Sequence, residues 1–158
     1  MSKTLIIDNT PYQYPTAGDE PGWGQGATGW AEAVTEVLND LVGPNDILET
    51  AFSIANNQTS FVNITGLTFN GASVRAADIT YSIFRVSSTN LSGHTETGTI
   101  QLIYDNNIGW SINQGNILGN AGVLFDVTSL GQVQYKSSDI GALSYVGTIK
   151  FRAKCLAQ

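Results

Sequence analysis

The sequence has few residues of the kinds that build metal centres, disulfides or nucleic-acid interfaces. It contains one histidine and one cysteine, Cys155, which excludes a zinc set and an internal disulfide framework, so we expect Cys155 to be a small, half-buried strand residue. Charged residues make up 13% of the chain, against roughly 25% in ordinary soluble domains. The formal charge of −6 leaves no basic face for a phosphate backbone, so nucleic acid is not an expected partner.

Long apolar runs are also missing. No stretch of about 18 apolar residues occurs, and the first residues do not form a charged-then-apolar leader. We therefore expect neither a membrane span nor a secretory signal, and the chain is expected to be made and to work as a soluble molecule. At 158 residues it can build one domain of ordinary size plus an arm.

No catalytic motif is present either. His94 has Ser92 and Glu96 two residues away on either side, but a serine-rich loop offers such neighbours by chance, and the strained G-x-S-x-G turn is absent. Asp105 and Asp126 could in principle supply paired carboxylates for sugar hydrolysis, but a sequence does not place them in space. We therefore expect a protein that is not an enzyme and that needs no cofactor or metal.

One segment has helical periodicity. A cap at Thr28 and a stop at Gly43-Pro44 predict an amphipathic helix over residues 28–43. Four of its apolar residues are also spaced 4-3-4, as in the seam of a two-heptad coiled coil, so the helix could dock on its own domain or on copies of itself. The apolar stripe consists of Trp30, Val34, Val37, Leu38 and Leu41.

The residues before this helix have no usable periodicity. Residues 1–27 contain three of the four prolines, and apart from the short apolar run at residues 5–7, which could pair as an edge strand, they predict an extended arm with fixed turns. Tyr12, Tyr14 and Trp23 would bury large areas if they found a groove. Such an arm could pack back on its own domain or bind a neighbouring surface.

From residue 44 onward the apolar period is two, which is typical of strands. The clearest strand is residues 78–86, and Ile108, Trp110 and Ile112 alternate in the same way, so all three are expected to face the core. About eight such stretches follow one another at spacings near ten residues, with turn signals between them. Residues 44–158 therefore predict a mainly β fold, an antiparallel, jelly-roll-like β-sandwich with one short α-helix before it.

The last strand carries a concentration of positive charge. Lys150, Arg152 and Lys154 alternate with apolar residues, so three of the seven basic residues share one face. Two interpretations stay open. The charges could form a solvated outer face that discourages aggregation, or they could form a basic stripe. Such a stripe could meet an acidic partner or the acidic face of the predicted helix, which carries Glu32, Glu36 and Asp40.

A family resemblance rests on four segments, PYQYPTAGDEPGWGQGATGWAEAVTEVLNDL, YSIFRVSSTNLSGHTETGTIQLIYD, GVLFDVTSLGQVQY and YVGTIKFRAKCL. Together they resemble small virion structural proteins and fibre-tip domains of tailed bacteriophages, particularly those infecting cyanobacteria. The PGWG arm followed by a WAEAV-type helix is the distinctive part. The resemblance implies a non-enzymatic β-sandwich, assembled as a trimer, that decorates and cements the capsid or forms part of a fibre. The chain has no extended shaft repeat, which favours a compact decoration protein.

The expected function is therefore assembly. We expect a homotrimeric capsid decoration or cement protein, made in the host cytoplasm and displayed on the virion surface. Its partners would be copies of itself and the major capsid protein or another virion protein, bound through an arm bearing Tyr12, Tyr14 and Trp23. The alternative is a tail or head fibre tip that binds a receptor or carbohydrate through Trp110 and the exposed loop from Ser87 to Thr95.

Overall fold

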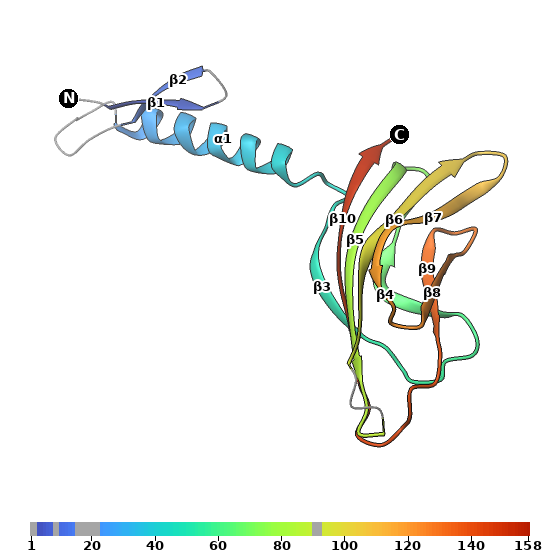
Figure 1. Ribbon diagram of the computed structural model, residues 1–158. Helices are drawn as coiled ribbons and strands as arrows, with labels where there is room; N and C mark the ends of the chain where they lie inside the picture. Colours follow the sequence, from blue (N-terminus) through green and yellow to red (C-terminus); the bar gives the residue numbers. More distant parts are fainter. Residues whose placement is uncertain (1–2, 8–9, 15–22, 90–92) are drawn as a thin grey trace. The chain divides into compact units, whose positions relative to one another are not determined.

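The computed structural model describes residues 3–7, 10–14, 23–89 and 93–158. The chain divides into two compact units, Met1–Pro44 and Asn45–Gln158 (Figure 1). The first unit contains strands β1 (Lys3–Ile7) and β2 (Thr10–Tyr14), which pair antiparallel, and helix α1 (Trp23–Leu41). The second unit contains all the remaining strands.

The first unit is more ordered than an extended arm. Residues 3–7 and 10–14 form a two-stranded sheet, and α1 begins at Trp23, so Thr28 lies inside the helix and is not its cap. Gly24 and Gly26 each cost about 1 kcal/mol in a helix relative to alanine, which is why the sequence favoured a later start. Because α1 lies against β2 and β1, tertiary contact outweighs that local preference.

The second unit is an antiparallel β-sandwich of eight strands, as predicted (Figure 1). A five-stranded sheet has the order β3-β10-β5-β6-β7 and a three-stranded sheet has the order β4-β9-β8. The strands are β3 (Ile47–Ser53), β4 (Val62–Thr68), β5 (Val74–Val86), β6 (His94–Asp105), β7 (Gly109–Gly119), β8 (Val123–Val127), β9 (Gln132–Ser137) and β10 (Val146–Ala157).

The pairing of the first and last strands of the sandwich is jelly-roll-like. The first strand of the sandwich, β3, pairs with the last, β10, and the second, β4, pairs with the second-last, β9. This nesting of strands from the two ends of the unit is the jelly-roll arrangement. The inner strands depart from it, because β5, β6 and β7 continue as a meander in the larger sheet.

The core lies between the two sheets. Alternate residues of β5 and β10 face inward, and Ile79, Tyr81, Ile149 and Phe151 are almost completely buried. Trp110 is in the core as predicted, with its ring 5.3 Å from Tyr104 and 6.1 Å from Phe69 between centroids. The prediction for Ile108 is wrong, because this residue belongs to the β6–β7 turn and is 78% exposed.

Candidate functional site

The outer face of the five-stranded sheet is polar and rich in hydroxyl groups. Because strand residues alternate between faces, the residues between the core positions of β10, β5 and β6 point away from the sandwich interior. Their antiparallel register sets them in rows across the sheet. One row is Lys150, Ser82 and Thr97, the next is Arg152, Thr80 and Thr99, and a third is Lys154, Asp78 and Gln101.

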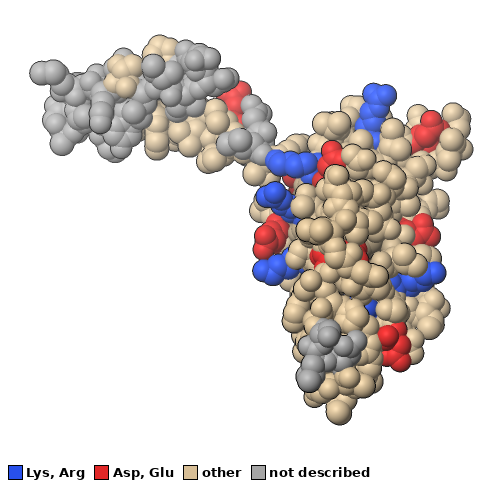
Figure 2. Space-filling model, viewed as in Figure 1, with Lys and Arg blue, Asp and Glu red and all other residues tan. Residues whose placement is uncertain are grey.

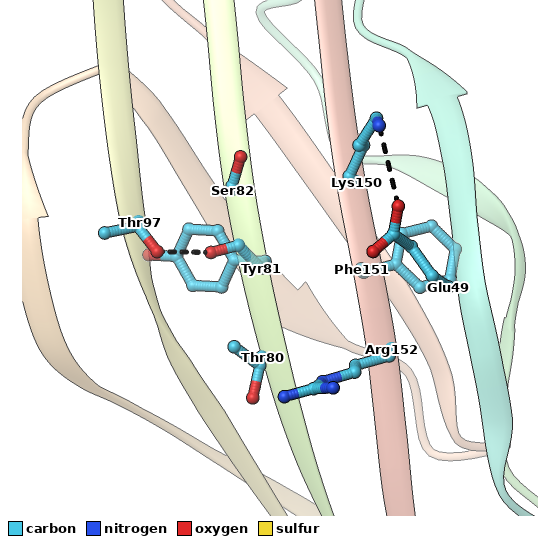
Figure 3. A pocket seen from close by; sticks show the side chains of 8 residues that line it. All are labelled: Glu49, Thr80, Tyr81, Ser82, Thr97, Lys150, Phe151 and Arg152. Atoms are coloured by element: carbon cyan, nitrogen blue, oxygen red, sulfur yellow. Dashed lines mark hydrogen bonds and ion pairs between the residues drawn. The ribbon is translucent and has the colours of Figure 1, made fainter.

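Two adjoining hollows lie on this outer face. The first has a volume of about 410 Å³ and is lined chiefly by Glu49, Thr80, Ser82, Thr97, Lys150 and Arg152 (Figure 3). The second, of about 330 Å³, shares Ser82 and Thr97 with the first and extends to Phe84 and Leu118. Together they form a groove, which we call the outer-face groove, with charged residues at one end and apolar residues at the other.

Most of the positive charge predicted on β10 is compensated by neighbouring carboxylates. The Lys150 ammonium lies 3.5 Å from the Glu49 carboxylate, and the Lys154 ammonium lies 2.7 Å from that of Asp46. Figure 2 shows basic and acidic side chains interspersed over the sandwich. Arg152, by contrast, forms no hydrogen bond or ion pair with any residue that the structure describes. The predicted basic stripe is therefore reduced to one unmatched cation, which lies in the outer-face groove.

The acidic residues considered for catalysis have structural roles. The buried Glu96 accepts hydrogen bonds from the Tyr81 hydroxyl at 2.8 Å and from the Ala121 amide at 2.9 Å. Burial, and then the Glu96 carboxylate, raise the pKa of Tyr81 well above its ordinary range. This pair holds β5, β6 and the β7–β8 loop together, and it is closed off from solvent.

The remaining candidate carboxylates each accept hydrogen bonds from backbone amides close by in the sequence. Asp105 accepts hydrogen bonds from the Asn107 and Ile108 amides at 2.7 and 3.1 Å, and Asp126 accepts one from the Val127 amide at 2.8 Å. No group of three or more His, Cys, Asp or Glu residues in the described ranges could hold a metal ion. Ser92, considered with His94, lies outside the described residues.

The single cysteine is half-buried, as predicted. Its thiol donates a hydrogen bond to the Asn45 carbonyl oxygen at 3.0 Å. Burial, with a smaller contribution from the Asp46 carboxylate, raises the pKa of Cys155 to about 11. Because the thiolate is the reactive species, this thiol is a weak nucleophile at neutral pH.

One buried arginine was not predicted from the sequence. Arg85 has no exposed surface, and its guanidinium donates to the carbonyl oxygens of Ala121 and Ser138, both at 2.6 Å. It also donates to Asn56 Oδ1 at 3.1 Å and to the Tyr145 hydroxyl at 3.0 Å. The signal was present, because position 85 continues the inward-facing series of 79, 81 and 83.

The network of Arg85 joins three connections at one end of the sandwich. Asn56 lies between β3 and β4, Ala121 between β7 and β8, and Ser138 and Tyr145 between β9 and β10. No buried side-chain nitrogen or oxygen among the described residues lacks a hydrogen-bond partner. Arg85 is therefore a structural clamp whose polar groups are satisfied within the protein.

The predicted helix stripe is partly shielded within the first unit. Trp30, Val34 and Val37 are half-buried, whereas Leu38 is 57% exposed and so lies outside the shielded strip. Ala33, which the predicted stripe did not include, is the buried residue of this strip. The side chain of Leu41 lies outside the described residues.

The predicted arm residues occupy regular elements. Tyr12 and Tyr14 belong to β2, and Trp23 is the first residue of α1. Their side chains lie outside the described part of the chain, so whether they bind a partner stays a prediction.

Trp110 does not take part in the alternative recognition surface. Trp110 is only 7% exposed and belongs to the core. Ser87 is buried and donates a hydrogen bond to the Ile140 carbonyl oxygen at 2.6 Å, while Ser88 and Thr89 are exposed. Residues 90–92 of this loop lie outside the described ranges. The outer-face groove, which the sequence did not reveal, is the better candidate for a ligand site.

No protein-family model matches the chain, and no curated protein matches it. The tailspike protein of Acinetobacter phage vB_ApiP_P1 is similar in structure, with a TM-score of 0.42 and 11% sequence identity over 69% of this chain. The likeness covers 21% of the tailspike chain. Within the described residues, no helix has the length and apolar character needed to cross a membrane.

Proposed function

We propose that the protein is a non-enzymatic structural component of a tailed-phage virion that acts by assembling with copies of itself through its first unit. The observation that carries this proposal is the apolar strip of α1, Trp30, Val34 and Val37, which is only partly buried within its own unit. A partly buried tryptophan and two valines on one helix face offer apolar area for an intermolecular contact. The family resemblance of the sequence gives the virion as the place of assembly.

The size of the first unit supports this proposal. Met1–Pro44 is a separate compact unit, and units of about 40 residues need disulfides, metals or oligomerisation to be stable. The only cysteine, Cys155, belongs to the other unit, so no disulfide can form within the first. A two-stranded sheet is marginally stable alone, and α1 covers it on a limited area. Association of several helices would complete the missing core.

In its most specific form, the proposal is a homotrimeric capsid decoration or cement protein on the virion surface. The 4-3-4 spacing of Trp30, Val34, Val37 and Leu41 suits a short parallel helix bundle. The first unit would then both trimerise and bind the major capsid protein or another virion protein, and the sandwich would be displayed outward.

A tail or head fibre tip is the second candidate. It is favoured by the outer-face groove, which gives the displayed sandwich a possible ligand site. Both candidates require the same self-association, and they differ in what the sandwich does afterwards.

Light scattering coupled to size exclusion tests the common part. We expect the full chain to be a trimer and the unit of residues 45–158, which has its own core, to be a folded monomer. Val34→Lys with Val37→Lys should dissociate the full chain, because two charges would enter the interface. Glu36→Lys, on the exposed side of the same helix, is the matched control and should remain trimeric.

A monomeric full chain would overturn the proposal, and a stable dimer would reject the trimer while leaving self-association in place. Co-sedimentation with phage particles then tests the virion role. The full chain should sediment with particles that lack it, and residues 45–158 alone should not. Equal sedimentation of both would place the attachment in the sandwich.

A further inference from the structure

We propose that the outer-face groove binds a short oligosaccharide bearing a carboxylate, with Arg152 binding the carboxylate and Phe84 packing against an apolar face of a sugar ring. The site lies wholly within the second unit. It therefore does not depend on how the first unit assembles, and its test fails or succeeds independently of the proposed self-association.

The charges around the groove indicate that the ligand carries a carboxylate. Lys150 and Glu49, both on the rim, form an ion pair at 3.5 Å and offer no net charge. Arg152 is exposed and unmatched among the described residues, and an arginine binds a carboxylate through two parallel hydrogen bonds. A polyphosphate or nucleic acid would need several unmatched cations, and the chain as a whole carries a charge of −6. One isolated carboxylate is the anion that this groove matches.

The floor of the groove supplies hydroxyl groups of two kinds. The Thr97 hydroxyl donates its proton to the Tyr81 carbonyl oxygen at 2.8 Å, so it faces the groove as an acceptor (Figure 3). The Thr80 and Ser82 hydroxyls form no hydrogen bond with any described residue and can both donate and accept. The Arg152 side chain reaches across from β10 toward Thr80, its partner in the strand register (Figure 3). A ligand that carries many hydroxyl groups beside its carboxylate can use all of these groups.

The apolar end of the groove sets the length of the ligand. Phe84 is 47% exposed, and its ring belongs to the second hollow, with Leu118 beside it. Phe84 lies four residues after Thr80, the partner of Arg152, on β5, which corresponds to about 13 Å along the strand. A single sugar does not span this distance, but a short oligosaccharide does. Sugar rings present an apolar C–H face as well as hydroxyl groups, so one chain can satisfy both ends.

Saturation-transfer NMR and calorimetry on the full chain test the proposal. The acidic test ligands are 3′-sialyllactose, trigalacturonate and a hyaluronan tetrasaccharide, and the neutral ones are lactose and maltotriose. We expect at least one acidic ligand to bind and its neutral counterpart to bind about tenfold more weakly or not at all, because the neutral ligand cannot form the paired hydrogen bonds with the exposed Arg152.

Four variants locate the binding. Arg152→Gln should weaken binding of the acidic ligand about tenfold and leave any binding of the neutral ligand unchanged. Phe84→Ala should weaken the binding of both. The matched controls are Arg75→Gln, which removes an exposed arginine outside the groove, and Phe61→Ala, which removes an exposed phenylalanine beside the other sheet. Neither control should change the affinity.

Three results would overturn the proposal. One is that none of the acidic ligands binds in the millimolar range. Another is that acidic and neutral ligands bind equally, with no effect of Arg152→Gln. The third is that Arg152→Gln alters the oligomeric state and no saccharide binds, which would assign the groove to a second copy of the chain. The urea unfolding midpoint of each variant should equal that of the parent protein, because the replaced side chains are exposed. An unchanged midpoint shows that a loss of binding is not caused by unfolding.

Discussion

The clamp at Arg85 provides the sharpest test of how the sandwich is stabilised. The variant Arg85→Met keeps a long side chain at this position but removes every hydrogen-bond donor of the guanidinium. The carbonyl oxygens of Ala121 and Ser138 stay where they are, because they belong to the backbone. The variant therefore leaves acceptors without partners, unlike replacement of a whole buried ion pair by apolar residues, which can be neutral.

The magnitude follows from the exposure of those acceptors. Ala121 has no exposed surface, so its carbonyl oxygen bears the full cost of an unmade bond, about 1–3 kcal/mol. Ser138 is exposed, so its carbonyl oxygen can accept a hydrogen bond from water instead. The variant also no longer has to bury a charged guanidinium. The lost hydrogen bonds to Ser138, Asn56 and Tyr145 therefore add only about 1 kcal/mol together. The expected loss is about 3 kcal/mol. At a urea m-value of about 2 kcal/mol/M, the unfolding midpoint falls by about 1.5 M.

Urea unfolding of residues 45–158, followed by tryptophan fluorescence, measures this loss. Arg85→Lys should lose less stability, because its ammonium keeps the charge and can still reach some of the acceptors. The exposed Arg75→Met is the control and should stay within about 0.5 kcal/mol of the parent protein. Hydrogen exchange should also speed up at the Ile140 amide, which donates to Asn56. A midpoint for Arg85→Met within about 0.25 M of the parent value would refute the clamp.

Two further predictions concern backbone geometry and thiol chemistry. Gly131→Ala should cost about 1–3 kcal/mol in urea unfolding, because position 131 has φ +81° and a Cβ there would collide with the Phe69 carbonyl oxygen. Gly115→Ala has an ordinary φ, and its added Cβ would make only an ordinary van der Waals contact with the Thr99 hydroxyl at 3.5 Å, so it should cost less than about 0.5 kcal/mol; equal losses would contradict the argument. Cys155 should react with iodoacetamide at pH 8 about 100-fold more slowly than an ordinary thiol, because its pKa is raised from 9.0 to about 11. The rate should climb as the pH rises toward 11 and the thiolate forms, and a fast reaction at pH 8 would show that the thiol is neither buried nor deactivated.

Local pattern was enough to predict the body of the fold. The period-two alternation from residue 44 onward predicted about eight strands, and it placed Trp110 in the core, because a sheet buried on one face imposes that period on every strand. Alternation does not show where a strand stops, which is why Ile108 was assigned inward although it belongs to a turn.

The remaining features depend on residues that meet only in three dimensions. Helix α1 begins at Trp23 because contact with β2 offsets the cost of two glycines, and no local rule contains that contact. The positive charge of β10 is neutralised by Asp46 and Glu49, about a hundred residues earlier in the chain, because β3 pairs with β10. That pairing leaves Arg152 unmatched and creates the outer-face groove. Strand order and register, which bring distant residues together, thus decided the candidate site, whereas the periodicity of side chains decided the fold class.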